Sequence, residues 1–176
     1  ENYFENIIII SEEQEFKDNL NFSENYLLSL DPIDGTENYA SGLPEWGVGL
    51  ALFFNNQHVY SMILLPELGL SIKTGDTLNY FESRIIGLSS SIHSNMNLKL
   101  DKGSEYRITG CSMYNIFNTI RGSFQCYKNI QGVNSWDILP GANLALEHNL
   151  KVKINGKKYE GKFLLPNKRY IIEITR

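Results

Sequence analysis

Two carboxylates, Asp31 and Asp34, flank the Pro-Ile pair of the segment Asp-Pro-Ile-Asp-Gly-Thr at positions 31–36. The segment follows an apolar run at 26–30 that predicts a buried strand. Because Pro32 cannot donate to a sheet ladder, we expect the strand to stop in this segment, with both carboxylates at its end. Gly35 allows the backbone to fold back tightly, which would turn both acids toward one concave spot. The segment therefore predicts a divalent cation site, and its alternative interpretation is an Asx turn between strands.

Two further acids could complete this site. Glu12 follows the β-branched run Ile7–Ile10, so a second strand is expected to end in carboxylates. Far along the chain, Asp137 in Trp-Asp-Ile-Leu-Pro-Gly is a candidate N-cap of a helix. If the fold brings Glu12, Asp31, Asp34 and Asp137 into one cleft, their charges require bound cations, because unpaired carboxylates repel one another and take up protons.

The order of these motifs resembles the inositol monophosphatase family of magnesium-dependent, lithium-sensitive phosphatases. The resemblance runs from about Ile7 to about Glu147 and rests on the Ser-Glu-Glu, Asp-Pro-Ile-Asp-Gly-Thr and Trp-Asp-x-x-Pro-Gly segments. Asn38-Tyr39, Gly42-Leu43-Pro44 and Gly110-Cys111-Ser112 also resemble family segments. The implied fold is of the α/β class, an α+β layered sandwich like that of inositol monophosphatases and sugar phosphatases.

The resemblance implies a site for two or more Mg²⁺ ions. One cation would lower the pKa of a bound water, and the other would shield the leaving oxygen during in-line displacement. The expected reaction is hydrolysis of a small phosphate monoester, such as an inositol phosphate, a sugar phosphate or a nucleotide 3′-phosphate. The metal ligands would be Glu12, Asp31, the backbone carbonyl of Ile33, Asp34 and Asp137.

Catalytic and substrate-binding roles are implied in the same way. Glu12 and Thr36 would hold and orient the attacking water, and Asp34 would act beside them. The backbone N–H groups of Gly35 and Thr36 would face a phosphate oxygen, while Asp137 would contribute to substrate binding as well as to the second metal. The protein is thus expected to be a metal-dependent phosphoric monoester hydrolase that needs no covalent intermediate.

Two other classes of phosphate enzyme are excluded by spacing. Haloacid-dehalogenase-like phosphatases also contain Asp-Gly-Thr, but their nucleophilic Asp lies two residues before the second Asp, and Asp31 stands three residues before Asp34. A Walker-type nucleotide site is absent from the sequence, because no Gly-x-x-x-x-Gly-Lys-Ser/Thr run occurs.

The sequence also departs from the family pattern. Family members begin with roughly two helices and a strand before the Glu-Glu segment, so residues 1–176 are expected to form a single domain that is truncated at its N-terminus. Lys128-Asn129-Ile130 stands where inositol phosphatases place an acid for sugar hydroxyls, which leaves the substrate open. The alternative function is a catalytically weak metal- or phosphate-binding homologue that acts as an interaction subunit.

Composition limits the partners and the compartment. A net charge of −4 and a pI near 5.4 argue against a nucleic acid polymer. The apolar run near the N-terminus is too short to span a membrane, so a cytoplasmic protein is expected, with a small phosphorylated metabolite as partner and a homodimer left open. Cys111 and Cys126 are interpreted as core thiols rather than metal ligands.

The elements that must position these residues are predicted from periodicity. Strands at 46–54 and 58–65 are expected to form an antiparallel hairpin through Asn55-Asn56. A helix is expected from Ser112 to Ile120, ending near Gly122, and another from near Asp137 through Leu146. Further strands are predicted at 84–88, 151–154 and 170–174.

Overall fold

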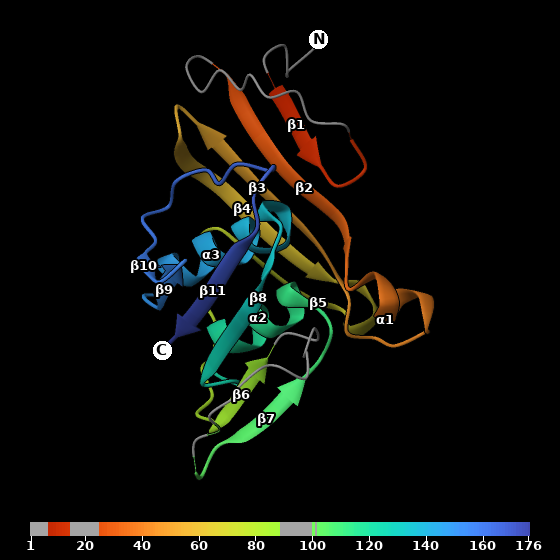
Figure 1. The fold of residues 1–176 in the computed structure, drawn as a ribbon, viewed down its shortest axis with the longest axis vertical. Helices are drawn as coiled ribbons and strands as arrows, with labels where there is room; N and C mark the ends of the chain where they lie inside the picture. Colours follow the sequence, from red (N-terminus) through yellow and green to blue (C-terminus); the bar gives the residue numbers. More distant parts are fainter. Residues whose placement is uncertain (1–6, 15–24, 89–99, 101) are drawn as a thin grey trace.

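Two helices lie between two sheets in the computed structural model, which describes residues 7–14, 25–88, 100 and 102–176 (Figure 1). Helix α3 (Ser135–Glu147) contacts strands of both sheets, and α2 (Ser112–Ile120) packs against α3 and against β8 (Cys126–Val133). Their apolar side chains merge with those of the sheets into one core. This arrangement confirms the expected α/β class and its layered α+β sandwich.

The first sheet carries the strands that end in acids. Its strand order is β1-β2-β3-β4-β5, with β1 parallel to β2 and the remaining neighbours antiparallel. The hairpin at Asn55 and Asn56 is confirmed, since both residues have the positive φ, 48° and 58°, that a type I′ turn requires. The strands are β1 (Ile7–Ser11), β2 (Tyr26–Asp34), β3 (Gly47–Phe54), β4 (Gln57–Leu65) and β5 (Leu70–Lys73).

The second sheet supplies the opposite wall of the core. Its order is β10-β9-β11-β8-β6-β7, in which β6 runs parallel to β7 and β8 while β11 is antiparallel to β8 and β9. Besides β8, its strands are β6 (Ile85–Leu88), β7 (Glu105–Ile108), β9 (Lys151–Ile154), β10 (Lys157–Lys158) and β11 (Tyr170–Thr175). The short helices α1 (Thr36–Ala40) and η1 (Pro66–Leu68) lie outside the two sheets.

The second strand ends in the acidic segment, as expected, but it runs through Pro32 before it ends. Strand β2 continues to Asp34, although its pairing with β1 stops at Leu30. Its register against β3 shifts between Asp31 and Asp34. Such an irregularity accommodates Pro32, which has no N–H to give to the ladder. Both acids therefore lie at the end of β2, next to the helices.

Two smaller expectations concern cysteines and membranes. Cys111 and Cys126 are free and buried, which confirms their interpretation as core thiols. Across the described ranges, no helix combines the length and the apolar character needed to cross a membrane.

The outer face of the first sheet is apolar and open among the described residues. Helices α2 and α3 pack on its inner face, where Ala51, Phe53 and Ile63 are fully buried. On the outer face, Ile9 is 45% exposed. A groove of about 370 Å³ on this face is lined by Ile7, Ile9, Leu28, Leu50, Leu52 and Tyr60.

This open face predicts binding of an apolar dye. Each Å² of apolar surface left in water costs about 25 cal/mol, so a dye that covers the groove is stabilised there. Leu50→Thr combined with Leu52→Thr is expected to lower the dye fluorescence of the 176-residue chain by about half. Ile171→Thr, on the second sheet, is the control and should leave the signal unchanged. A dye-silent, monodisperse chain would show that the groove is covered.

Candidate functional site

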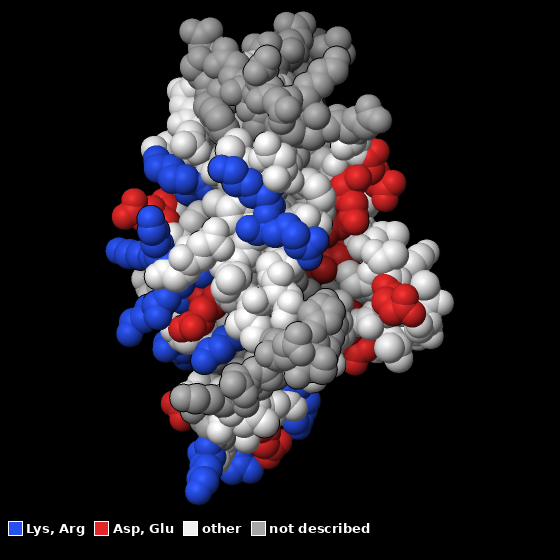
Figure 2. Space-filling model, viewed as in Figure 1, with Lys and Arg blue, Asp and Glu red and all other residues white. Residues whose placement is uncertain are grey.

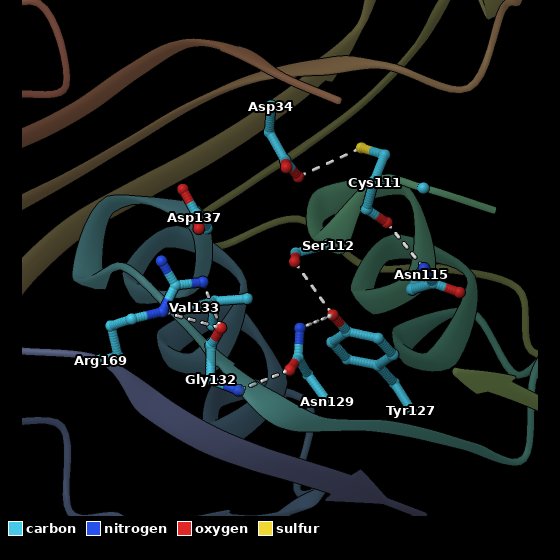
Figure 3. Close-up of a pocket in the computed structure, with 11 residues that line it drawn as sticks. Asp34, Cys111, Ser112, Asn115, Tyr127, Asn129, Gly132, Val133, Asp137 and Arg169 are labelled. Atoms are coloured by element: carbon cyan, nitrogen blue, oxygen red, sulfur yellow. Dashed lines mark hydrogen bonds between the residues drawn. The ribbon is translucent and has the colours of Figure 1, made fainter. Parts of the chain in front are cut away.

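The acids predicted from the sequence raise one another's pKa values. Burial, together with the charges of Asp34 and Glu12, raises the pKa of Asp31 to about 7. Burial and the charges of Asp34 and Asp31 raise the pKa of Asp137 to about 9. Strand ends β1 and β2 and the start of α3 thus bring together residues that lie more than a hundred positions apart in the sequence. Asp34 and Asp137 line the same pocket (Figure 3).

Asp31 presents an acceptor without a donor. The residue is 1% exposed, and its Oδ1 accepts the backbone N–H of Ile33 at 3.0 Å. Its Oδ2 is buried and has no hydrogen-bond partner. A proton retained on Asp137 would be shared with Asp31 and would favour the charge on Asp31. With both groups ionised, the buried Oδ2 needs a positive partner, so this oxygen fits a divalent cation.

Asp34 is held at the N-terminus of α2. Its Oδ2 accepts the N–H of Met113 and the thiol of Cys111, the latter at 3.1 Å. Burial, followed by the charge of Asp34, raises the pKa of the Cys111 thiol, so the thiol keeps the proton that it donates. The Cys111 sulfur also accepts the N–H of Tyr114 at 3.2 Å and caps the helix. The backbone N–H of Ser112 also favours the charged form of Asp34, so three groups at the start of α2 act on this carboxylate.

Asp137 is not the N-cap of α3. The helix begins at Ser135, and Asn134 with its extended backbone is the N-cap. Asp137 lies in the first turn, where its Oδ2 accepts the N–H of Asn134 at 3.0 Å as part of a capping box. The carboxylate therefore helps to begin the helix and also faces Asp31, a combination that the helix N-terminus favours electrostatically.

Glu12 completes the acidic field without closing a ligand shell. It lies in the exposed turn after β1, and its charge raises the pKa values of Asp31, Asp34 and Asp137. Among the described residues, no three His, Cys, Asp or Glu side chains stand close enough to hold an ion as they are placed. The acids share a field, and rotation of their side chains is needed to bring them onto one cation.

The segment 33–36 is fixed by its own contacts. Thr36 Oγ1 donates to the carbonyl of Ile33 at 3.2 Å. Gly35 has a φ of 89°, and a Cβ at this position would lie 2.9 Å from Cys111 Cβ. Only glycine therefore fits the close approach of the acidic segment to the start of α2. Because the Thr36 hydroxyl donates its hydrogen bond to the Ile33 carbonyl, its oxygen lone pairs can accept a hydrogen bond from water.

Asn38 fastens the acidic segment to the second half of the site. Its Nδ2 donates to the carbonyl of Glu45 at 2.7 Å and to that of Thr109 at 2.6 Å. Gly110, which follows, has a φ of 79°, and a Cβ there would lie 2.9 Å from Asn38 Oδ1. These contacts hold α1 against the turn that leads into α2, so that Asp34 and Cys111 stay together.

A polar pocket of about 160 Å³ adjoins the acids. Tyr127 donates from its hydroxyl to Ser112 Oγ at 2.9 Å, and burial raises the pKa of Tyr127. Sequence reasoning missed most of this wall, because its residues come from β8, from α2 and from the start of β11 and form no motif. The wall comprises Gly110, Cys111, Ser112, Asn115, Tyr127, Asn129, Gly132, Val133 and Arg169 (Figure 3).

A second cluster has the residue types of a nucleophilic triad, but a substrate cannot reach its serine. His58 Nε2 lies 2.8 Å from Ser61 Oγ, and His58 Nδ1 lies 3.6 Å from Glu147 Oε1. Ser61 is 0% exposed, so no substrate can reach its oxygen. Glu147 also accepts from Thr74 at 2.9 Å. The cluster ties the end of α3 to β4 and β5 and is structural.

Comparisons with known proteins show the family of this chain. A sequence profile described as "Inositol monophosphatase family" matches residues 1–90. The chain is 46% identical over 39 residues to the Sinorhizobium fredii (strain NBRC 101917 / NGR234) protein y4fL. This match covers 22% of this chain and 14% of that protein.

Solved structures show the same fold. A dual-specific IMPase/NADP phosphatase bound with D-inositol-1-phosphate has a TM-score of 0.78 at 22% identity, over 99% of this chain and 72% of its own. A Ca-bound IMPase family protein from Staphylococcus aureus has a TM-score of 0.78 at 23% identity, over 98% and 70%. The family profile covers half of the sequence, and the acidic segments lie where the fold brings them together. The chain belongs to the inositol monophosphatase family.

Proposed function

We propose that this chain carries the metal centre of a phosphatase that hydrolyses a small phosphate monoester with a metal-activated water. The observation that carries the proposal is the orphaned Oδ2 of Asp31, a buried acceptor surrounded by the charges of Asp34, Glu12 and Asp137. A proton on Asp137 can be shared with this oxygen, and once both carboxyls are ionised the oxygen needs a cation. Structures of IMPase/NADP phosphatase contain D-inositol-1-phosphate in one case and NADP with Ca²⁺ in another, which supports a phosphate ester and divalent metals here.

The donor set suits magnesium. Carboxylate and carbonyl oxygens are hard ligands, and Mg²⁺ prefers them over nitrogen or sulfur. When bound, two or more Mg²⁺ ions would supply an activated water and a shield for the leaving oxygen. The residues that would hold them are Glu12, Asp31, Ile33 through its carbonyl, Asp34 and Asp137.

The chain's own groups would orient the reaction. Thr36 Oγ1 donates to the carbonyl of Ile33 and can therefore accept a hydrogen bond from the attacking water, which fixes the direction of a water lone pair. Glu12, in the exposed turn, is proposed to hold the same water from the other side. The N–H groups of Gly35 and Thr36 are proposed to bind a phosphate oxygen, with Asp137 contributing to the substrate site.

The partner and the compartment are proposals drawn from composition. A small phosphorylated metabolite, rather than a nucleic acid polymer, is the proposed ligand of an acidic chain whose net charge is −4. Cytoplasmic residence and a homodimer belong to the same proposal.

A second candidate is an interaction subunit that binds metal or phosphate but turns over slowly. The open apolar groove on the first sheet favours it, because an exposed apolar face of this kind is typical of a docking surface. The two candidates differ in one observable. A screen for magnesium-dependent phosphate release from small phosphate esters is expected to show ready turnover for the phosphatase and only slow turnover for the subunit.

Asp34→Asn is expected to weaken magnesium binding about tenfold or more, because an amide lacks the charge that offsets ion dehydration. Isothermal calorimetry of the metal-free chain measures this directly. Glu37→Gln, an exposed acid on α1, is the matched control and should bind Mg²⁺ as the original chain does. Equal affinity in the Asp34 variant and the original chain would remove Asp34 from the site.

Thr36→Ala is expected to lower kcat about tenfold or more while magnesium affinity changes little, because the hydroxyl orients water and carries no metal charge. The assay follows phosphate release from the best ester of the screen, with calorimetry of Mg²⁺ alongside. Thr36→Ser, which keeps the hydroxyl, should restore most of the rate. A parallel loss of rate and metal affinity would assign Thr36 to the turn structure alone.

A further inference from the structure

Arg169 places a guanidinium at the rim of the pocket that Asp34 and Asp137 also line (Figure 3). Its Nε and Nη2 donate to the carbonyl of Gly132 at 3.2 and 2.6 Å. A guanidinium has five N–H donors, so these bonds leave the others for a ligand. None of the ion pairs found among the described residues includes Arg169. The Arg169 guanidinium is therefore held in one orientation, while no ion pair among the described residues neutralises its charge.

The backbone beneath Arg169 is built to receive it. Asn129 Oδ1 accepts the N–H groups of Gln131 and Gly132, each at 3.1 Å, and so fixes the turn in β8. Gly132 has a φ of 86°, and a Cβ there would lie 3.3 Å from Arg169 Cβ. A guanidinium held in this way loses little further freedom when it binds a ligand, which favours affinity.

The pocket is lined by groups of both charges. Asp34 and Asp137 are its acidic groups and Arg169 is its basic one. In Figure 3 the Arg169 guanidinium lies on the Asp137 side of the pocket, and the neutral groups of Ser112 and Tyr127 lie on the other side. Figure 2 shows basic side chains over the start of β11 beside acidic ones near the ends of β1 and β2. Once cations neutralise the acids, the guanidinium is the charge in this pocket that remains available to an anion.

We propose that Arg169 binds a second anionic group of the substrate, a carboxylate or a phosphate, while the phosphate ester lies at the acids. This inference rests on the proposed function and assigns its substrate class, namely small phosphate esters with a further negative charge. Arginine suits such a group because its planar N–H donors match the oxygens of carboxylates and phosphates. Esters whose remaining groups are hydroxyls offer this guanidinium only weaker, neutral acceptors.

The test compares ligands that differ in one group. 2-Phosphoglycerate has a carboxylate where glycerol 2-phosphate has a hydroxymethyl group, and fructose 1,6-bisphosphate has a second phosphate that fructose 6-phosphate lacks. Calorimetry with Ca²⁺ present is expected to show about tenfold tighter binding of the doubly anionic member of at least one pair, since a hydrogen bond to a charged group contributes about 1.5 kcal/mol or more. The pair that shows the preference identifies the second group.

Arg169→Gln should bring the affinity ratio of that pair close to one. Arg169→Lys keeps the charge but lacks the planar set of N–H donors, so it should retain part of the preference. Lys168→Gln is the matched control, because the neighbouring cation does not line the pocket, and it should keep the full ratio. Melting temperatures verify that the variants fold.

Two results would overturn the inference: an unchanged affinity ratio in Arg169→Gln, as when both ligands of a pair weaken equally, or a doubly anionic ligand that binds the original chain no more tightly than its singly anionic counterpart in either pair. Binding through Arg169 without phosphate release would instead count against the proposed phosphatase and leave the inference standing.

Discussion

Mutual repulsion among buried carboxylates is the constraint on which this structure depends. Asp31, Asp34 and Asp137 are removed from water and face one another's charge and that of Glu12, so each Asp holds its proton more tightly than a free side chain does. Surrounding contacts keep the acids in place despite this. Three contacts each anchor a different acid. They are the pairing of β1 with β2, the capping of α2 around Asp34 and the capping box of α3. A bound cation would relieve the repulsion that these contacts oppose.

The acids could be predicted from the sequence because their signals are local. An apolar run before Asp31 and a β-branched run before Glu12 mark strand ends, and Trp-Asp before a Pro-Gly pair marks a helix start. The exact boundaries were less accessible. Pro32 stops most strands, but here a register shift absorbs it. Asn134 and Asp137 both have side chains that suit an N-cap. The extended backbone of Asn134 identifies that residue as the cap.

The far wall of the pocket could not be predicted, for physical reasons. Lys128, Asn129 and Gln131 interrupt the apolar alternation of β8, so the strand has no clear sequence signature. Arg169 gains its position from a carbonyl 37 residues earlier, a contact that exists only after β8 and β11 pair. The triad-like set around Ser61 shows the converse, since suitable residue types meet there at a site that is fully buried.

Unfolding free energy against pH, with and without Mg²⁺, tests the central claim most directly. In the unfolded chain these aspartates titrate near their ordinary pKa of about 4, whereas in the folded protein their pKa values rise to about 6, 7 and 9. Between these values the folded state holds more protons, so the metal-free protein should lose stability as the pH rises from about 4 to about 9. Saturating Mg²⁺ should abolish this loss, because it binds the ionised carboxylates. A metal-free protein whose stability does not fall over this range, or a fall that Mg²⁺ leaves unchanged, would contradict the account.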